Sequence, residues 1–246
     1  MDDNLTLDKN HILNICDLIE KEKLEITFEG STRANLVDEE VISKMARAGL
    51  IRMSFGLESI DENVRRIMRK EVPLESYIIA NKLMNKYNIE TWNSCMIGLP
   101  GETIDTIKKT LSFLRDSPEI KQANISIAVP YPGTELYEMA KRGDYGLKLV
   151  GDDFSKFRRY NCASMIVGDL SPDDLIKLQN DAFASIYLAP WRLKPVLGKS
   201  GIAGVFLTFS RLIKSIVRGR FELLAIDRNY WKRRNNLGKD EKKNKK

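Results

Sequence analysis

The chain has 246 residues, of which 43% are hydrophobic and 30% are charged. This is an ordinary balance for a folded globular protein, and it excludes a chain that is disordered throughout. The formal net charge of +6 is unevenly placed. From Arg228 onward Lys and Arg dominate, with Asp240 and Glu241 as the only acids, so the positive charge describes the tail and not the fold.

The cysteines and the first residues indicate a cellular compartment. Cys16, Cys95 and Cys162 are sparse and far apart, which is typical of reduced thiols and not of a disulfide framework. Asp2 and Asp3 are acidic where a signal peptide would be basic, and no apolar run approaches the roughly 20 residues that span a bilayer. We therefore expect a cytoplasmic protein.

Strand and helix patterns alternate over the first 140 residues. Apolar residues at helical spacing predict the first helix, and Asp38 and Gly49 have the chemistry of an N-cap and a C-terminal glycine. The expected helices are 8–22, 38–49, 61–69, 73–87, 103–114 and 134–141, and the expected strands are 25–28, 50–57, 89–97 and 123–129.

Alternating strands and helices predict a parallel sheet, in which binding sites lie at the carboxyl ends of the strands. Each expected strand ends in a segment rich in polar residues, glycine or proline. These segments are 29–33, 56–59, 98–102 and 130–134. Four such endings on one edge are hard to explain as simple connections, so this edge is the expected site.

The strands also alternate polar and apolar residues, whereas strands covered by helices on both faces are apolar throughout. We expect the polar face to line a cavity and to include Arg52, Ser54, Asn93 and Ser126. This favours a curved, barrel-like sheet over a flat, doubly wound one. An antiparallel sheet with one wet face is the remaining alternative, which the intervening helices disfavour.

The pattern changes after about residue 143. Residues 154–162 are aromatic and basic, Ser171 and Pro172 have the chemistry of a helix start, and Pro190 ends that helix. An amphipathic stripe with basic residues opposite covers 202–217. We expect three parts: a barrel portion over 1–142, a mainly helical extension over 143–226, and a basic, disordered tail over 227–246.

The segment IETWNSCMIGLPGET, residues 89–103, is a predicted strand that runs into a Gly-Pro-Gly turn and opens a helix. Such a turn presents unpaired backbone N–H groups, and glycine lets a ligand approach them closely. A plain strand–turn–helix joint explains the motif in isolation equally well. The turn is not a Walker P-loop, because it lacks the Lys-Ser/Thr pair. It is not a dinucleotide fingerprint either, because its glycines do not have the spacing of that motif.

Four segments taken together are more specific. TRANLVDEE, AGLIRMSFGLES, MIGLPGET and PYPGTELY, in this order, resemble the later strands of the radical S-adenosylmethionine (SAM) barrel. The likeness is to the branch often associated with a cobalamin-binding domain. It covers residues 1–142, and 170–190 resembles that branch's helical extension. The resemblance implies an α/β fold, an incomplete (β/α)6 TIM-like partial barrel with a C-terminal helical extension, and SAM across the strand tops.

The resemblance also implies which residues contact the cofactor. Glu58 and Ser59 would face the ribose or the methionine part of SAM, and Arg33 would lie near the substrate or the SAM carboxylate. Without the family pattern, Glu58 and Arg33 would be interpreted as a salt-bridged loop pair.

The other implied contacts come from two turns. Gly98, Pro100 and Gly101 would pass the backbone under the cofactor, and Pro130 and Tyr131 would border the adenine. An ordinary turn is the alternative for the second segment.

One part of the family pattern is missing. A radical SAM enzyme holds a [4Fe–4S] cluster with three cysteines in a CxxxCxxC loop, and this sequence has no such motif. Residues 2–6 resemble the segment just after the family's second strand. We therefore expect the C-terminal part of a longer, split or degenerate gene product, with an exposed sheet edge at 25–28.

Three functions remain open. The first is a radical SAM enzyme that uses a 5′-deoxyadenosyl radical or SAM with cobalamin, inactive alone and completed by a separately encoded N-terminal half. The second is a non-catalytic remnant. The third is a partner or membrane-surface docking module built on 202–217. Nucleic-acid binding by the basic tail is not expected, and the sequence does not identify a substrate.

Overall fold

The computed structural model describes residues 4–151 and 153–189, which lie in the first of the two units of the chain, 1–193. The amphipathic stripe 202–217 and the basic tail lie outside the described residues. The helices are α1 (Lys9–Lys21), α2 (Glu39–Ala48), α3 (Glu62–Ile67), α4 (Leu74–Lys86), α5 (Ile104–Asp116), α6 (Glu135–Arg142) and α7 (Pro172–Tyr187). The strands are β1 (Phe28–Thr32), β2 (Leu50–Glu58), β3 (Glu90–Ile97), β4 (Gln122–Ile127), β5 (Leu147–Leu149) and β6 (Met165–Val167). Short 3₁₀ turns cover Ala34–Leu36, Asp144–Gly146 and Phe154–Lys156.

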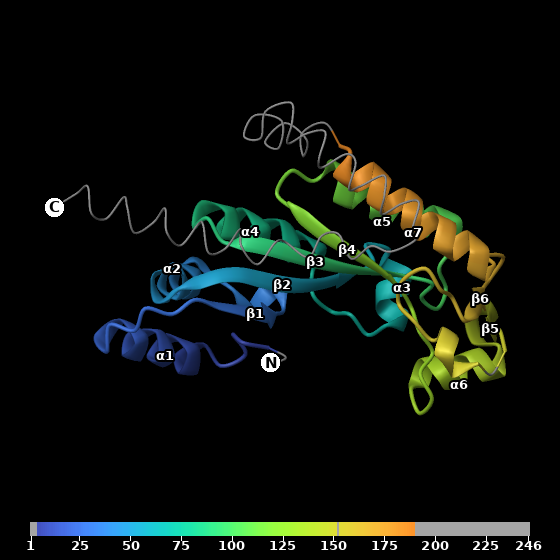
Figure 1. Cartoon of the computed structure of the whole chain (residues 1–246), viewed down its shortest axis with the longest axis horizontal. Coiled ribbons are helices and arrows are strands. Elements are labelled where there is room, and N and C mark those ends of the chain that lie inside the picture. The colour runs from blue at the N-terminus through green and yellow to red at the C-terminus, as the bar shows by residue number, and fades with distance from the viewer. Residues whose placement is uncertain (1–3, 152, 190–246) are drawn as a thin grey trace. The chain divides into compact units, whose positions relative to one another are not determined.

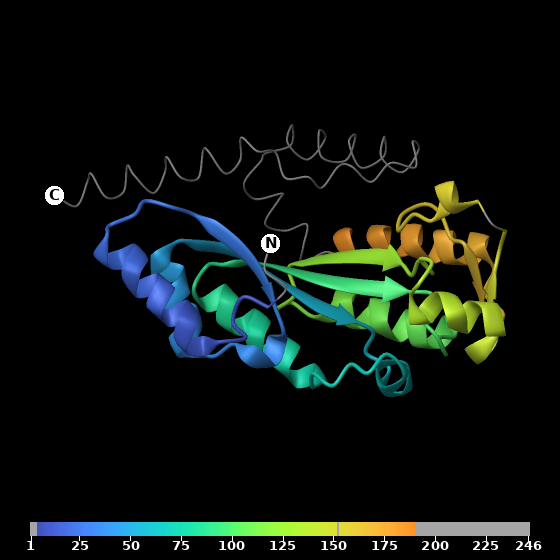
Figure 2. The ribbon, with the colours of Figure 1, turned by 90° about the horizontal axis from the view of Figure 1, so that it is seen from below.

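The first four strands form a parallel sheet in the order β1-β2-β3-β4, as Figure 1 shows. This confirms the expected α/β fold and rules out the antiparallel alternative. In Figures 1 and 2 the strand arrowheads point to the end of the sheet where α3 and α6 lie. The carboxyl ends of the strands therefore share one edge, as the sequence predicted.

Both ends of α2 and the start of α7 follow from the predicted caps. The side chain of Asp38 accepts from the N–H of Val41 at the start of α2, and Gly49 ends that helix with a φ of 110°. Ser171 and Pro172 begin α7, where Ser171 and Asp174 form a capping box. Caps of this kind satisfy backbone N–H groups that the helix itself leaves unpaired.

The first strand was placed wrongly. The sequence predicted a strand over 25–28, and the structure has it at Phe28–Thr32. The reason is the position of its partner: Gly49 turns the chain, β2 begins at Leu50, and Leu50 pairs with Phe28. Among the described residues, none before Phe28 belongs to a paired strand. The N–H of Leu5 donates to the carbonyl of Ser31 at 2.9 Å, so the N-terminal segment covers part of the outer edge of β1.

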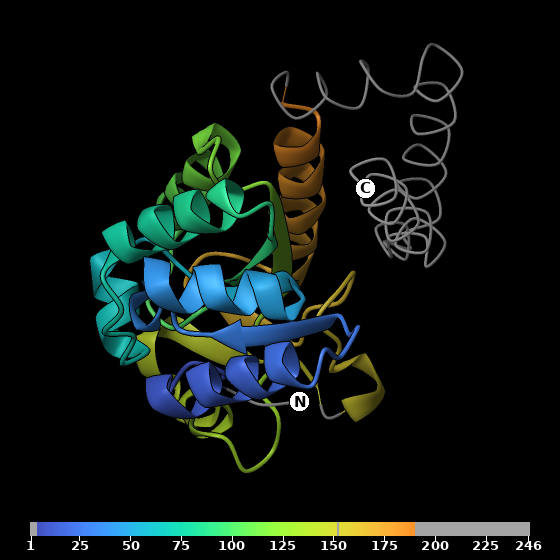
Figure 3. The ribbon, with the colours of Figure 1, turned by 90° about the vertical axis from the view of Figure 1, so that its left-hand side faces the viewer.

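The sheet has one apolar and one polar face. On β2 the buried residues Met53, Phe55 and Leu57 alternate with the half-buried Ser54 and Gly56. The helices pack on the apolar face, where α2 and α4 lie side by side (Figure 3). The polar face and the partial-barrel curvature expected from the alternation are consistent with this arrangement.

The assignment of Asn93 to the polar face was wrong. Asn93 pairs in register with the core residue Phe55, is fully buried, and exchanges hydrogen bonds of 2.9 and 3.0 Å with Asn81 of α4. It therefore lies on the helix-covered face. A buried Asn is tolerated there because a second Asn satisfies its amide.

Helix α7 closes the β4 edge of the sheet, beside which it runs in Figure 1. The Gln179 amide donates to the carbonyls of Ile125 and Arg159, at 2.8 and 2.9 Å, and accepts from the N–H of Asn161 at 3.0 Å. The antiparallel pair β5–β6 was missed by the sequence, because three-residue strands carry almost no periodicity. The three-part division of the chain stays a prediction.

Candidate functional site

The polar face ends in a charged cluster at the carboxyl end of β2. Glu58 has a left-handed backbone conformation with a φ of 62°, next to an irregularity in the β2–β3 register. This conformation is uncommon for residues other than glycine and is found at functional sites. A Cβ on Gly56 would lie 2.7 Å from Glu58 Oε1 and 3.3 Å from Lys70 Nζ. The carboxylate and the ammonium group therefore both lie over Gly56.

Burial controls the charges of this cluster. Desolvation raises the pKa of Glu58, against the opposing effects of Lys70 and Arg159. Desolvation also lowers the pKa of Lys70, which Glu58 raises while Arg65 and Arg33 lower it further. Within the described part of the chain, neither Glu58 nor Lys70 forms a salt bridge. Two partly desolvated, opposite charges without a bond to each other can bind a ligand that carries both an ammonium and a carboxylate group.

The sequence named Arg33 and Glu58, and the structure brings them into one electrostatic cluster. Arg33 follows β1, is exposed, and acts on Lys70. The sequence did not name Lys70 or Arg159. Lys70 lies in a loop after α3, and Arg159 lies in the basic and aromatic segment after β5. No local pattern distinguishes these two cations from the many other surface ones, since only the fold brings them to the strand ends.

Arg65 holds the loop that carries Glu58. Its side chain is only 8% exposed, and its guanidinium donates to the carbonyls of Ser59, at 3.1 Å, and Val72. Tyr77 packs beside it and donates to the carbonyl of Gly56 at 2.7 Å. Burial raises the pKa of Tyr77 to about 12, so its hydroxyl stays a donor. These hydrogen bonds fix the position of the backbone that carries the charged cluster.

Ser59 has a different placement from the one expected. It is 1% exposed, its hydroxyl lies 3.3 Å from the Thr110 hydroxyl of α5, and it accepts from the N–H of Asp61. The side chain is used within the fold, in the layer between β2 and α5. Its contact with a cofactor stays a prediction that the placement does not favour.

In the glycine-rich turn after β3, the side chain of Glu102 accepts hydrogen bonds from the backbone of the turn itself. Glu102 Oε2 accepts from the N–H groups of Gly98 and Leu99, at 2.7 and 3.0 Å. The prediction that these N–H groups are unpaired and offered to a ligand was therefore wrong. Glu102 is 3% exposed, and its Oε1 has no hydrogen-bond partner within the described residues. Burial raises the pKa of this carboxyl to about 8.

The glycines of the turn serve packing. Gly98 and Gly101 have φ values of 82° and 78°, in the region that favours glycine. A Cβ on Gly98 would lie 3.4 Å from Leu175 of α7, and one on Gly101 would lie 2.8 Å from Ile67 of α3. Close approach is required here by neighbouring side chains. The predicted passage of the backbone under a cofactor stays a prediction.

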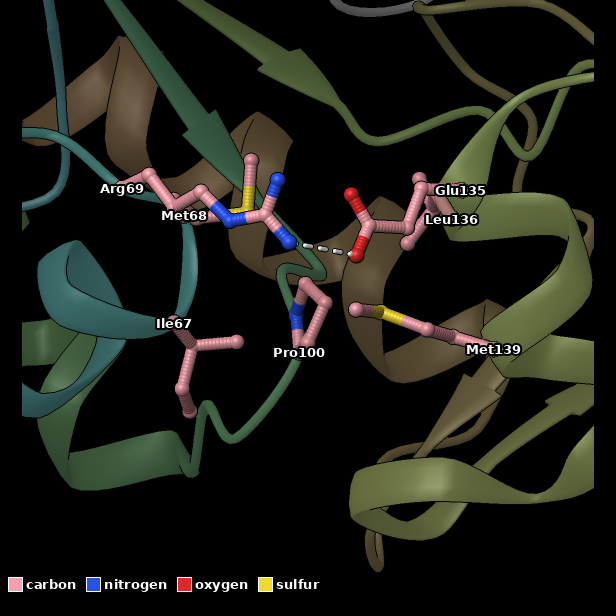
Figure 4. A pocket seen from close by; sticks show the side chains of 7 residues that line it. All are labelled: Ile67, Met68, Arg69, Pro100, Glu135, Leu136 and Met139. Carbon is pink, nitrogen blue, oxygen red and sulfur yellow. Dashed lines mark hydrogen bonds and ion pairs between the residues drawn. The ribbon is translucent and has the colours of Figure 1, made fainter.

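The remaining predicted residues follow β4 or line a hollow. Pro130 is buried, whereas Tyr131 is 43% exposed and donates to the carbonyl of Phe157 at 3.5 Å. Pro100 lines a hollow of about 180 Å³ between α3 and α6, and Gly101 lines the adjoining one. Figure 4 shows Pro100 between the side chains of Ile67 and Met139, below the Arg69–Glu135 ion pair.

The cysteines do not form an iron–sulfur site. Cys16 and Cys95 are buried on α1 and β3, and burial raises the pKa of both thiols. Cys162 lies in a loop beyond β5. Nowhere in the described ranges do three His, Cys, Asp or Glu residues converge to hold a metal. Three thiolates on one cluster are therefore not available in this fold. No helix in the same ranges is long and apolar enough to cross a membrane.

Comparison with known proteins identifies the fold family. Residues 4–114 match the radical SAM superfamily. This part of the chain belongs to that superfamily. An uncharacterised methyltransferase from Pyrococcus horikoshii is 29% identical over 221 residues, which are 89% of this chain and 45% of the relative. The anaerobic magnesium-protoporphyrin IX monomethyl ester cyclase of Rubrivivax gelatinosus is 27% identical over 159 residues, covering 63% of this chain and 27% of the relative.

Solved structures of radical SAM proteins share the fold. The cobalamin-dependent radical SAM enzyme OxsB matches 93% of this chain and 39% of its own, with a TM-score of 0.59 and 15% identity. A radical SAM methyltransferase from Kitasatospora setae matches 72% of this chain and 36% of its own, with a TM-score of 0.54 and 17% identity. The chain thus spans less than half the length of these radical SAM proteins and of the two relatives.

Proposed function

We propose that this chain binds SAM on the polar face of its sheet and serves as the SAM-binding part of a radical SAM enzyme. The observation that carries the proposal is the pair of opposite charges over Gly56. SAM has an α-ammonium group and an α-carboxylate, and Glu58 and Lys70 offer one partner to each. Superfamily membership of residues 4–114 supports the same ligand.

The rest of the cofactor would extend along the strand ends. The register places Met96 and Ser126 side by side on the polar face, beyond Ser94 and Asn124. These positions offer an apolar side chain for a ring and polar ones for a ribose. Arg33 and Arg159 would leave the region positive, which favours an anionic substrate group. When bound, SAM supplies a methyl group or a 5′-deoxyadenosyl group for the chemistry.

The [4Fe–4S] cluster and cobalamin differ in how this chain's residues and relatives support them. The described residues do not fit a [4Fe–4S] cluster, so its ligands would come from a separate polypeptide that acts with this chain. Cobalamin is supported only by OxsB and by the cobalamin-bound Kitasatospora methyltransferase, whose likeness to this chain extends to the fold alone. The name of the Pyrococcus relative supports a methyl-transfer reaction on a substrate still to be found.

Titration of the chain with SAM should test the binding site. We expect measurable heat of binding, and a loss of about tenfold or more in affinity for Glu58→Gln and for Lys70→Met, because each loses a charge-assisted contact. Gly56→Ala should weaken binding similarly, since its methyl group displaces both head groups. Glu71→Gln, at an exposed neighbour of Lys70, is the matched control and should bind normally. Equal affinities for all four variants would refute the site.

Anaerobic reconstitution with iron and sulfide should test the cluster assignment. We expect this chain alone to retain no stoichiometric iron after desalting and to lack a charge-transfer absorbance, because its cysteines do not converge. The measurement is iron content per chain together with the visible spectrum. A spectrum typical of a [4Fe–4S] cluster at one cluster per chain, lost in a Cys162→Ser variant, would contradict the expectation.

A further inference from the structure

A cleft separate from the Glu58–Lys70 cluster lies at the same edge of the sheet. It consists of two adjoining hollows of about 180 and 460 Å³, which share Ile67, Arg69, Glu135 and Met139. The walls come from the end of α3 with the loop after it, from the turn at Pro100, and from α6 (Figure 4). We call it the α3–α6 cleft. None of its lining residues belongs to the charged cluster on β2.

The inner part of the cleft is apolar. Its lining is contributed by both helices and by the turn, and Figure 4 shows the side chains of Ile67 and Met139 on either side of Pro100. The complete apolar set is Ile67, Met68, Pro100, Leu136 and Met139. Methionine side chains are flexible and polarizable, so they adapt to apolar groups of varied shape. The hollow therefore suits an alkyl or acyl chain better than a polar ligand.

The rim of the cleft is cationic. Arg69 donates to Glu135 Oε1 at 3.1 Å, and Arg66 donates to Asn63 Oδ1 at 2.7 Å. The Arg69 and Glu135 side chains are 79% and 58% exposed. An exposed ion pair of this kind is worth at most about 1 kcal/mol, so a ligand anion can replace Glu135 at little cost. With two guanidinium groups and one carboxylate, the rim has an excess of positive charge.

We propose that the α3–α6 cleft binds a small amphipathic anion. Its alkyl part lies on Ile67, Pro100 and Met139, and its carboxylate or phosphate accepts from Arg69 and Arg66. A guanidinium group matches both anions, because its planar N–H groups can pair with two oxygens. Arg69 exchanges its partner from Glu135 to the ligand, and Glu135 moves toward solvent. The site is independent of SAM binding, since no group of the charged cluster takes part.

Calorimetric titration of the full chain with octanoate and with octyl phosphate tests the proposal, with octylamine as the probe of equal chain length and opposite charge. We expect both anions to bind and the amine not to bind. Arg69→Gln should lose about tenfold in affinity, because it removes a charge-assisted contact. Glu135→Gln should gain affinity, because it removes the competing carboxylate. Arg142→Gln, on the same helix but paired with Asp144, is the matched control.

Methyl-labelled methionine spectra locate the binding. The Met68 and Met139 methyl signals should shift with either anion in the parent chain and in Arg142→Gln, and should shift less in Arg69→Gln at the same probe concentration. Thermal unfolding of each variant checks that it is folded. Binding of octylamine equal to that of octanoate, unchanged affinity in Arg69→Gln, or no binding of either anion would each overturn the proposal. Unchanged SAM affinity in Arg69→Gln would separate this site from the proposed function.

Discussion

Replacing Glu102 by alanine is expected to lower the free energy of unfolding by about 3 kcal/mol. The carboxyl accepts from the N–H groups of Gly98 and Leu99, and both N–H groups lie in a buried turn. Alanine leaves them without a partner, and each unsatisfied buried N–H costs roughly 1–3 kcal/mol. Urea unfolding followed by circular dichroism measures the loss. The exposed Asp105→Ala, three residues along the chain, is the control and should change the stability little.

The same carboxyl should make stability depend on pH. Burial raises its pKa from 4.5 to about 8 in the folded chain, so the folded state binds the proton more tightly than the unfolded state. The stabilising contribution is complete below about pH 4.5 and is lost as the pH rises through about 8. We therefore expect a lower free energy of unfolding at pH 9 than at pH 6, by an amount on the order of a few kcal/mol.

Glu102→Gln separates the two effects. The amide has the shape of the protonated carboxyl and can accept from both N–H groups, but it does not titrate. We expect this variant to be close to the parent chain at pH 6 and to lose most of the difference between pH 6 and pH 9. A parent chain of equal stability at both pH values would show that Glu102 stays ionised in the fold. A pH dependence that persists in Glu102→Gln would assign it to another group.

The parallel order of the four strands could be predicted because its causes are local. The side chains of Asp38 and Ser171 accept from backbone N–H groups at the starts of helices, and Gly49 ends a helix. The alternation along β2 shows which face of the sheet the helices cover. These patterns depend only on residues that are close in the sequence, so they can be recognised without knowledge of the fold. The family pattern rests on the same strand endings, which explains why it agrees with the order of the strands in the sheet.

The errors have a different cause, since each depends on the partner that a residue meets in the folded chain. The start of β1 is set by where β2 begins, and Asn93 is polar yet buried because Asn81 of α4 satisfies it. Glu102 accepts from the N–H groups of Gly98 and Leu99, a contact within the turn that the glycine pattern alone does not reveal. Polarity alone does not separate a side chain that meets a ligand from one that meets the protein itself.

The charged cluster was predicted from the sequence only in part. Glu58 was named because it ends a strand in a family segment, while Lys70 enters the cluster only through the path of the loop after α3. Its sequence neighbours Arg69 and Glu71 are also charged, but both are exposed. What distinguishes Lys70 is burial beside Glu58, and burial is a property of the folded chain.

Arg65 donates to both the loop after β2 and the loop after α3, so its replacement should have the second large effect on stability. We expect Arg65→Met to lower the free energy of unfolding by about 3 kcal/mol, because it leaves the carbonyls of Ser59 and Val72 without their donor in a buried site. Arg65→Lys keeps the charge but lacks the planar fork that reaches two carbonyls at once. It should therefore lose nearly as much, whereas a purely electrostatic role would leave it close to the parent chain.

Two measurements distinguish geometry from charge at this position. Urea unfolding gives the stability of Arg65→Met, Arg65→Lys and the exposed neighbour Arg66→Met, which should change little. SAM titration of Arg65→Lys, below its unfolding transition, reports whether the loop still presents Glu58. We expect weaker binding, because the carbonyl of Ser59 is released next to a residue held at a φ of 62°. Parent-like stability and binding in Arg65→Lys would mean that the guanidinium does not hold the site in place.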